Sequence, residues 1–251
     1  MDNKIMSDMI TNHKSCYISK DSNGNITEIH LRPKQIEESL KDKLQPEDIC
    51  KAGKIVERIG EYNQLKMSLC NGCIETNCSK RNNSLTALPN GNINAKVMFI
   101  NKQPTEYESA YGLSFSDKNG LFISLILDKI NVPRESVYFT DMIKCNNQLD
   151  EQSFNECINR YLMEEINIVN PSVIVCNSMS VFKTCISRGI FKGLPSDISY
   201  GNIYDAELFN GNHIKVTAIY DLNTVLQKEG EDYIRCKNDL WSQILNAFKA
   251  L

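Results

Sequence analysis

Four cysteines in two separated pairs could together bind a metal. Cys70 and Cys73 form a Cys-x-x-Cys pair, and Cys145 and Cys157 follow far downstream. Thiolate sulfur is a preferred ligand of zinc and of iron–sulfur clusters, and two such pairs can converge on one centre when the chain folds. Their spacing does not separate the two metals. The pattern indicates a cysteine-bound metal centre, with Cys78 as a reserve ligand because it follows Cys73 closely.

Two other interpretations of these cysteines stay open at this level. A Cys-x-x-Cys redox pair normally lies at a strand-to-helix turn of a βαβ unit, whereas Cys70 and Cys73 precede the first strand of the predicted α/β region. The four thiols could also be unrelated, because free cysteine is often simply a small buried apolar residue. That interpretation suits five further cysteines: Cys16, Cys50, Cys176, Cys185 and Cys236.

The elements that must position these residues alternate regularly from Ala95 onward. Short apolar runs, typical of buried parallel strands, occur at residues 97–100, 137–140, 173–176 and 214–219. Helices are predicted at residues 117–130, 153–169, 178–188 and 231–248, the second opening with a capping box of Ser153 and Glu156. Strands that alternate with helices predict an α/β sandwich.

The first 65 residues have a different pattern and are predicted to be an extension. Two strands at residues 14–18 and 26–31, joined through Asn23-Gly24, predict a hairpin. Polar helices are expected over residues 35–44 and 46–67. We therefore expect an N-terminal extension over residues 1–65 and a main domain over residues 66–251.

Composition limits the classes of function. The 251 residues include 28 Lys and Arg against 31 Asp and Glu, a formal net charge of −3. Because dedicated nucleic-acid binders usually carry a basic excess, duplex binding would have to rest on a local surface. The chain has neither a signal-peptide pattern nor an apolar stretch long enough to span a membrane. These features predict a soluble, cytoplasmic protein without membrane contact.

The ordered motifs between Leu69 and Phe248 resemble the iron–sulfur branch of the uracil-DNA glycosylase superfamily, the family 4 type. That family has a Cys-x-x-Cys pair, then a strand running into Gly-Glu-Ala-Pro-Gly, where this chain has Asn101-Lys102-Gln103-Pro104-Thr105. Its Gly-x-Pro-Phe-Val-Gly is similar to residues 112–117, and its Thr-Asn-x-x-Lys-Cys to residues 140–145. Its second motif, Thr-Tyr-His-Pro-Ser, is similar to the segment that contains Asp221.

The resemblance implies a fold and a cofactor. The fold is a three-layer α/β sandwich with a short parallel central sheet, preceded here by the small α+β extension. The cofactor is a 4Fe–4S cluster that supports structure rather than chemistry. Its ligands, by resemblance, are Cys70, Cys73, Cys145 and Cys157.

The resemblance also assigns residues that bind the base. Phe115 occupies the stacking position, and Pro104 and Thr105 belong to the same pocket. The family's edge-reading asparagine is Asp141 here, which only accepts hydrogen bonds when it is ionised. Uracil would then fit badly, whereas the exocyclic amino group of cytosine or adenine would fit. The alternatives are an ordinary core phenylalanine and an aspartate that merely ends a strand.

Three departures affect catalysis. The family's water-activating carboxylate is replaced by Lys102, and Gln103 supplies no carboxylate either. Lys102 could contact a phosphate or act as an amine nucleophile. The histidine of the second motif is Asp221, which could activate water or stabilise a sugar cation. Alternatively, Lys102 and Asp221 form an ion pair that fills a retired pocket.

Two further segments are expected near DNA. Leu222, Asn223 and Thr224 occupy the loop that enters the DNA groove in the family, where an apolar wedge can replace a flipped base. Glu106 and Glu108 lie near the expected pocket mouth and could supply a displaced general base. A surface turn is the alternative for the first segment.

These residues predict a DNA N-glycosylase-like protein that binds a flipped base, with a base preference altered from uracil. One alternative is a catalytically inactive module that binds nucleic acid or a nucleotide and acts through a partner of residues 1–65. A second alternative is an enzyme on free nucleosides or nucleotides. The expected partners are single- or double-stranded DNA, or a nucleotide.

Overall fold

The computed structural model of the chain describes residues 17–20, 26–30, 46–71, 73, 77–79 and 85–251. The chain separates into two compact units, Met1–Glu61 and Tyr62–Leu251. In the first unit, β1 (Tyr17–Lys20) and β2 (Ile26–His30) pair antiparallel, as a hairpin requires, and the predicted Asn23-Gly24 turn lies outside the described residues. The helix predicted over residues 35–44 lies outside the described residues. Helix α3 (Pro46–Cys70) ends at the first candidate cysteine. None of the described helices is both long and apolar enough to span a membrane.

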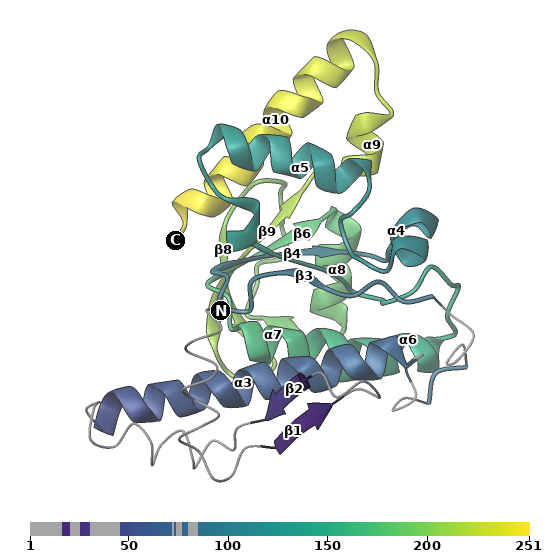
Figure 1. Cartoon of the computed structure of the whole chain (residues 1–251). Helices are drawn as coiled ribbons and strands as arrows, with labels where there is room; N and C mark the ends of the chain where they lie inside the picture. Colours follow the sequence, from purple (N-terminus) through teal and green to yellow (C-terminus); the bar gives the residue numbers. More distant parts are fainter. Residues whose placement is uncertain (1–16, 21–25, 31–45, 72, 74–76, 80–84) are drawn as a thin grey trace. The chain divides into compact units, whose positions relative to one another are not determined.

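The second unit is built on a seven-stranded sheet of order β3-β5-β4-β6-β9-β8-β7 (Figure 1). Its four central strands run parallel, as the apolar runs predicted: β5 (Tyr138–Asp141), β4 (Val97–Asn101), β6 (Val173–Asn177) and β9 (His213–Ile219). Three antiparallel strands extend the edges: β3 (Asn90–Gly91), β8 (Tyr204–Leu208) and β7 (Phe191–Lys192). Sequence analysis missed them because two have only two residues and β8 contains two charged residues.

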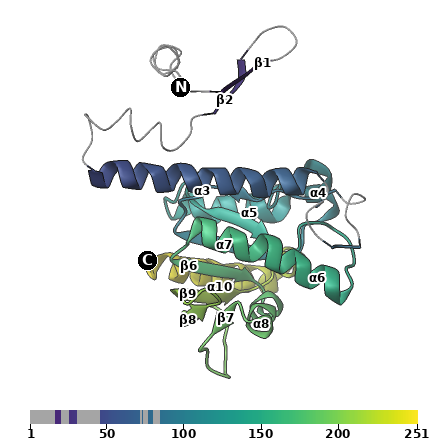
Figure 2. The ribbon, with the colours of Figure 1, turned by 90° about the horizontal axis from the view of Figure 1, so that it is seen from below.

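Helices cover both faces of this sheet, so the unit has three layers. Along β4, Met98 and Ile100 join the core that includes α7 and α8, whereas Val97 and Phe99 join the core that includes α5 and α10. Figure 2 views the sheet from the side of α6 and α7. The helices are α4 (Glu106–Tyr111), α5 (Lys118–Lys129), α6 (Glu151–Cys157), α7 (Met163–Val169), α8 (Met179–Ser187), α9 (Leu222–Leu226) and α10 (Gly230–Lys249), with a 3-10 turn at Arg134–Ser136. The three-layer α/β fold is thus confirmed.

The helix predicted to open with a Ser153–Glu156 capping box begins earlier. Asp150 is its N-cap, and its Oδ1 accepts a hydrogen bond from the backbone N–H of Ser153 at 2.7 Å. The hydroxyl of Ser153 instead accepts a hydrogen bond from the backbone N–H of Ser79 at 2.9 Å, so the predicted capping box is wrong. A π-helical turn, Ile158–Leu162, separates α6 from α7 directly after Cys157. Such turns are often found at functional sites.

Candidate base-binding site and metal centre

The strand order makes the boundary between β4 and β6 the topological switch point of the sheet. The chain passes from β4 to β5 on one side and then crosses to β6 on the other, which makes the β4–β6 boundary the point where the winding direction reverses. In open α/β sheets, ligands bind outside the carboxyl ends of the strands at this switch point. Most of the predicted pocket residues follow the carboxyl ends of β4, β5 and β9.

A chain of buried hydrogen bonds connects four elements at the switch point. The backbone N–H of Leu222 donates to Asn177 Oδ1 at 3.1 Å, and Asn177 Nδ2 donates to Asn101 Oδ1 at 3.1 Å. Asn101 Nδ2 then donates to Asp141 Oδ1 at 3.1 Å. The ends of β4, β5 and β6 and the start of α9 are therefore held in one network. Sequence analysis missed both asparagines, although each one directly ends an apolar strand.

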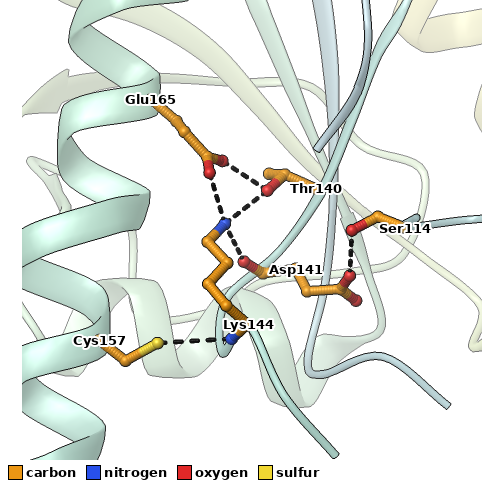
Figure 3. Close-up of polar contacts among 6 residues, drawn as sticks. All are labelled: Ser114, Thr140, Asp141, Lys144, Cys157 and Glu165. Carbon is orange, nitrogen blue, oxygen red and sulfur yellow. Dashed lines mark hydrogen bonds and ion pairs between the residues drawn. The ribbon is translucent and has the colours of Figure 1, made fainter. Parts of the chain in front are cut away.

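Asp141 lies inside the wall of this site and is fully buried. Its Oδ2 accepts a hydrogen bond from Ser114 Oγ at 2.5 Å (Figure 3). Because Oδ1 accepts from Asn101, both carboxyl oxygens have protein partners. Burial, together with the negative charge of Glu108, raises the pKa of Asp141 from 3.8 to about 7, although Ser114 and Lys144 act in the opposite direction. Asp141 is therefore present in both protonation states near neutral pH, whereas sequence analysis assumed only the ionised state.

Phe115 is packed rather than open to solvent. It is 2% exposed, and its ring centroid lies 5.1 Å from that of Phe139 in the core on the α5 side. Its backbone has a φ of +53°, an uncommon value for a residue with a side chain. Arg134 holds this conformation, because its Nη2 donates to the Phe115 carbonyl at 2.7 Å and its Nη1 donates to the Gly120 carbonyl at 2.9 Å.

The segment after β4 leads into α4. Lys102 is exposed, and Gln103 Nε2 donates to Asn146 Oδ1 at 3.1 Å. Pro104 is buried, and Thr105 is the N-cap of α4, where it forms a capping box with Glu108. Lys102 therefore lies at the surface and Thr105 has a structural role.

The two acidic residues expected at the pocket mouth differ in position. Glu106 is exposed, whereas Glu108 is 1% exposed and its Oε2 accepts the backbone N–H of Thr105 at 2.8 Å. Burial raises the pKa of Glu108. Glu108 therefore closes the first turn of α4 from inside, and a role of either residue as a displaced general base stays a prediction.

The two carboxylate oxygens of Asp221 differ in their contacts. Its Oδ1 caps α9 by accepting the backbone N–H of Thr224 at 2.8 Å and the Thr224 hydroxyl at 3.0 Å. Its Oδ2 has no hydrogen bond to the described residues, and the side chain is partly exposed. Among the described residues, Lys102 and Asp221 do not form the predicted alternative of an ion pair. Asp221 Oδ1 contacts Thr224 of its own helix instead.

The loop expected to contact DNA is mostly held by the protein. Leu222 is fully buried in the core on the α10 side, so it does not project as an apolar wedge. Asn223 Oδ1 accepts a hydrogen bond from Asn119 Nδ2 at 3.1 Å, which joins α9 to α5. Thr224 is exposed. DNA contacts by Asn223 and Thr224 stay a prediction.

Three of the candidate metal ligands share one neighbourhood. Cys145 and Cys157 are buried in an apolar cluster, and the partly buried Cys73 packs against it. The backbone N–H of Lys144 donates to Cys157 Sγ at 3.4 Å, a type of contact that also tunes iron–sulfur clusters. Burial raises the pKa of Cys157 to about 12, so this thiol is protonated without a metal.

Cys70 and Cys78 are the two candidates for the fourth ligand. Cys70 is exposed at the end of α3, and Cys78 is partly buried. Residues 72 and 74–76, which connect this segment, lie outside the described part of the chain. Within the described part, no three His, Cys, Asp or Glu side chains are close enough to hold a metal ion. Buried sulfurs with a backbone N–H donor fit a cluster chemically, and the cluster itself stays a prediction.

A buried ion pair next to these cysteines was not predicted from the sequence. Lys144 is 1% exposed, and its Nζ lies 2.8 Å from Glu165 Oε1 (Figure 3). The same Nζ donates to Thr140 Oγ1 at 2.6 Å and to the Asp141 carbonyl at 2.7 Å. Burial raises the pKa of Glu165, and Lys144 opposes that change. This network connects the end of β5 to α7, and through the Lys144 backbone to Cys157.

Comparison with known proteins places this site in a family. The family model of the uracil DNA glycosylase superfamily matches residues 88–246, which include Cys145 and Cys157 but not Cys70 and Cys73. A relative from Archaeoglobus fulgidus, named type-4 uracil-DNA glycosylase, is 30% identical over 143 residues, 55% of this chain and 70% of the relative. Relatives of the same name from Thermotoga maritima and Saccharolobus solfataricus are each 30% identical, over 34% of this chain. These matches span only 46% and 41% of those two relatives. The chain therefore belongs to the uracil DNA glycosylase superfamily, with its similarity in the type-4 branch.

Proposed function

We propose that this protein is a DNA N-glycosylase-like protein that holds a flipped base at the β4–β6 switch point, with a base preference that differs from that of a uracil-specific enzyme. The names of the relatives support DNA as the substrate. The observation that carries the altered preference is the buried Asp141 at the end of β5, hydrogen-bonded by Ser114 and Asn101. An asparagine there would present an amide, whereas Asp141 presents a carboxyl group that titrates near pH 7.

A base edge would reach the buried Asp141 by displacing Ser114 or Asn101, and the protonation state of Asp141 would then decide which edge it can bind. A neutral carboxyl has one donor and one acceptor, similar to the amide of asparagine, so it can pair with uracil. An ionised carboxyl only accepts, so it favours a base with an exocyclic amino group. Because the pKa of Asp141 is about 7, a uracil-like base would be favoured below pH 7 and an amino-bearing base above it.

Excision would use Asp221 in place of the missing carboxylate at Lys102 and Gln103. The N-glycosidic bond breaks with its electron pair leaving on the base, and the sugar cation is captured by water. Asp221 Oδ2, which has no protein hydrogen bond among the described residues, would accept a proton from that water. The departing base would take a proton from solvent, and Lys102, exposed beside the site, would contact a phosphate.

A cysteine-bound 4Fe–4S cluster would support the fold in this proposal. Cys73, Cys145 and Cys157 already share one neighbourhood, and Cys70 or Cys78 would supply the fourth sulfur. The cluster would supply structural cross-linking between α6 and the segments that carry its other ligands. The protein partner expected for residues 1–65 stays a prediction.

One observation favours a second candidate function, a base-binding module without excision. Asp221 Oδ1 already caps α9, and no carboxylate stands at Lys102 or Gln103. A protein of this kind would bind DNA or a nucleotide and act through a partner. An enzyme on free nucleosides stays a weaker alternative. It would need no DNA surface, so salt-dependent binding of DNA would distinguish the other two candidates from it.

One assay separates these candidates. Labelled single- and double-stranded oligonucleotides with uracil, cytosine, hypoxanthine or 5-substituted pyrimidines are incubated with the protein and treated with alkali, which cleaves abasic sites. We expect cleavage with wild type and its loss with Asp221→Asn, because asparagine keeps the helix cap but cannot accept the proton. Asp197→Asn, at an exposed aspartate in the loop between β7 and β8, is the matched control.

The base preference has its own comparison. Asp141→Asn should shift cleavage toward uracil and remove the dependence of base choice on pH. Cleavage that persists in Asp221→Asn would contradict the catalytic role of Asp221. Absence of cleavage on every substrate, with DNA binding retained, would favour the binding module.

A further inference from the structure

Two tyrosines on α4 form an exposed aromatic surface beside the switch point. Tyr107 and Tyr111 are 58% and 66% exposed. They lie one helical turn apart, their ring centroids are 6.0 Å apart, and the ring planes are parallel to within 6°. Parallel exposed rings present flat faces, and nucleobases stack on such faces with little dependence on sequence.

The short helix that carries these rings is fixed at both ends. Thr105 and Glu108 form the capping box at its start, and Gly112 ends it in the left-handed conformation with φ +81°. Glu108 and Ser109 are buried on the inner side. The helix backbone that carries the rings is therefore fixed before any ligand arrives, which lowers the entropic cost of binding.

The location and charge of α4 indicate which partner it would contact. The helix follows β4 after only four residues, at the same edge of the sheet as α9 and the base site (Figure 1). The exposed carboxylate of Glu106 in the same helix disfavours phosphate contact, so the favourable contact would be with base faces. Bases inside a duplex are covered by their neighbours, whereas bases of a single strand are free to stack on protein.

We propose that Tyr107 and Tyr111 are a stacking platform for a single-stranded DNA segment that flanks the nucleotide held at the switch point. This inference rests on the proposed function and deepens it by naming the strand state of the partner. Each exposed ring takes one base face, and the phosphates between those bases stay in solvent. The platform therefore adds affinity for single strands of any sequence.

The test measures binding of a labelled single-stranded oligonucleotide, the matching duplex and an RNA of the same sequence by fluorescence anisotropy. The variants are Tyr107→Ala, Tyr111→Ala and their combination, with Tyr107→Phe/Tyr111→Phe as the matched control that keeps both rings. We expect about tenfold weaker single-strand binding for each ring removed. Duplex binding and the salt dependence should change less than twofold, because neither ring contacts phosphate. Circular dichroism checks that the alanine variants remain folded.

The outcomes separate this inference from the proposed function. Wild-type protein that binds no DNA at all contradicts both. If wild type binds single strands and the double alanine variant binds them equally tightly, only the platform is contradicted. Loss of duplex and single-strand binding by the same factor also overturns it, because stacking on unpaired bases would not weaken both equally. RNA binding stronger than DNA binding, and lost in the same variant, would overturn the assignment to DNA.

Discussion

At the residue scale, burial gives the carboxyl group of Asp141 properties that its position in the sequence does not indicate. Its ordinary pKa is 3.8, and in the folded protein burial and the nearby Glu108 raise the pKa to about 7. The folded state therefore binds the proton more tightly than the unfolded chain does. This difference makes stability, as well as base choice, depend on pH.

We expect the free energy of unfolding to fall as pH rises from about 4 to about 7 because of this group. The contribution is fully present below the unfolded pKa and is lost as pH passes through the folded pKa. The difference in pKa corresponds to on the order of 4 kcal/mol. Urea unfolding of wild type and Asp141→Asn at about pH 5 and about pH 8 measures the part that is lost above pH 5, about 3 kcal/mol, because the asparagine variant lacks this titration. Glu106→Gln is the exposed control, and equal pH profiles for wild type and Asp141→Asn would contradict the assignment.

Arg134 shows how a residue outside the family motifs positions one inside them. Its guanidinium donates to the carbonyls of Phe115 and Gly120 and to Ser124 Oγ at 2.7 Å. It also lies 4.4 Å from the centre of the Phe139 ring, against which Phe115 packs. Arg134 therefore holds the loop of the predicted stacking residue through several directed contacts.

Arg134→Lys should lower the free energy of unfolding by about 2 kcal/mol, because an ammonium group cannot keep both carbonyl contacts in one plane. The measurement is urea denaturation at fixed pH. Arg235→Lys serves as the control, since the Arg235 side chain is 71% exposed and forms a surface ion pair with Asp232. A loss for Arg134→Lys no larger than that of the control would show that the clamp contributes nothing.

At the element scale, the junction of β6 and α8 combines a useful cap with an unfavourable backbone. The backbone of Ser178 has φ +133°, a value that residues with a Cβ rarely adopt. Its hydroxyl nevertheless accepts the backbone N–H of Val181 at 3.2 Å and so caps α8. The residue directly follows Asn177, which belongs to the hydrogen-bond chain of the switch point.

Two substitutions of Ser178 should change stability in opposite directions. Ser178→Gly relieves the backbone strain and loses little as a cap, so we expect a gain of about 1 kcal/mol. Ser178→Ala keeps the strain and loses the cap, so we expect a loss of about 1 kcal/mol. Thermal unfolding of both variants at one pH provides the comparison. If both variants destabilise, the cap matters more than the strain.

At the scale of the whole molecule, apolar periodicity predicted the four parallel strands and the helices that cover them, because burial on both faces leaves a continuous apolar run. It could not predict the chain Leu222–Asn177–Asn101–Asp141, since these residues meet only after β4 and β6 become neighbours. Nor could residue type show that Glu108 and Lys144 are buried. Lys144 is held by Glu165, a partner that the sequence does not place beside it, whereas Glu108 is held by Thr105 in the capping box of its own helix.

The proposed cluster would join α6 to the segment after β5 and to the segment that carries Cys73, so its loss should affect the whole fold. Anaerobically purified protein should be brown and contain about four irons per chain. Cys145→Ser should lose colour and iron, whereas Cys176→Ser, at a buried cysteine of the other core, should keep both. Comparing Cys70→Ser with Cys78→Ser identifies the fourth ligand. Because a cluster binds only the folded state, its removal by a chelator should lower the melting temperature of wild type but not of Cys145→Ser. A colourless zinc protein would overturn the assignment of an iron–sulfur cluster, and Cys145→Ser with full iron content would overturn the assignment of Cys145 as a ligand.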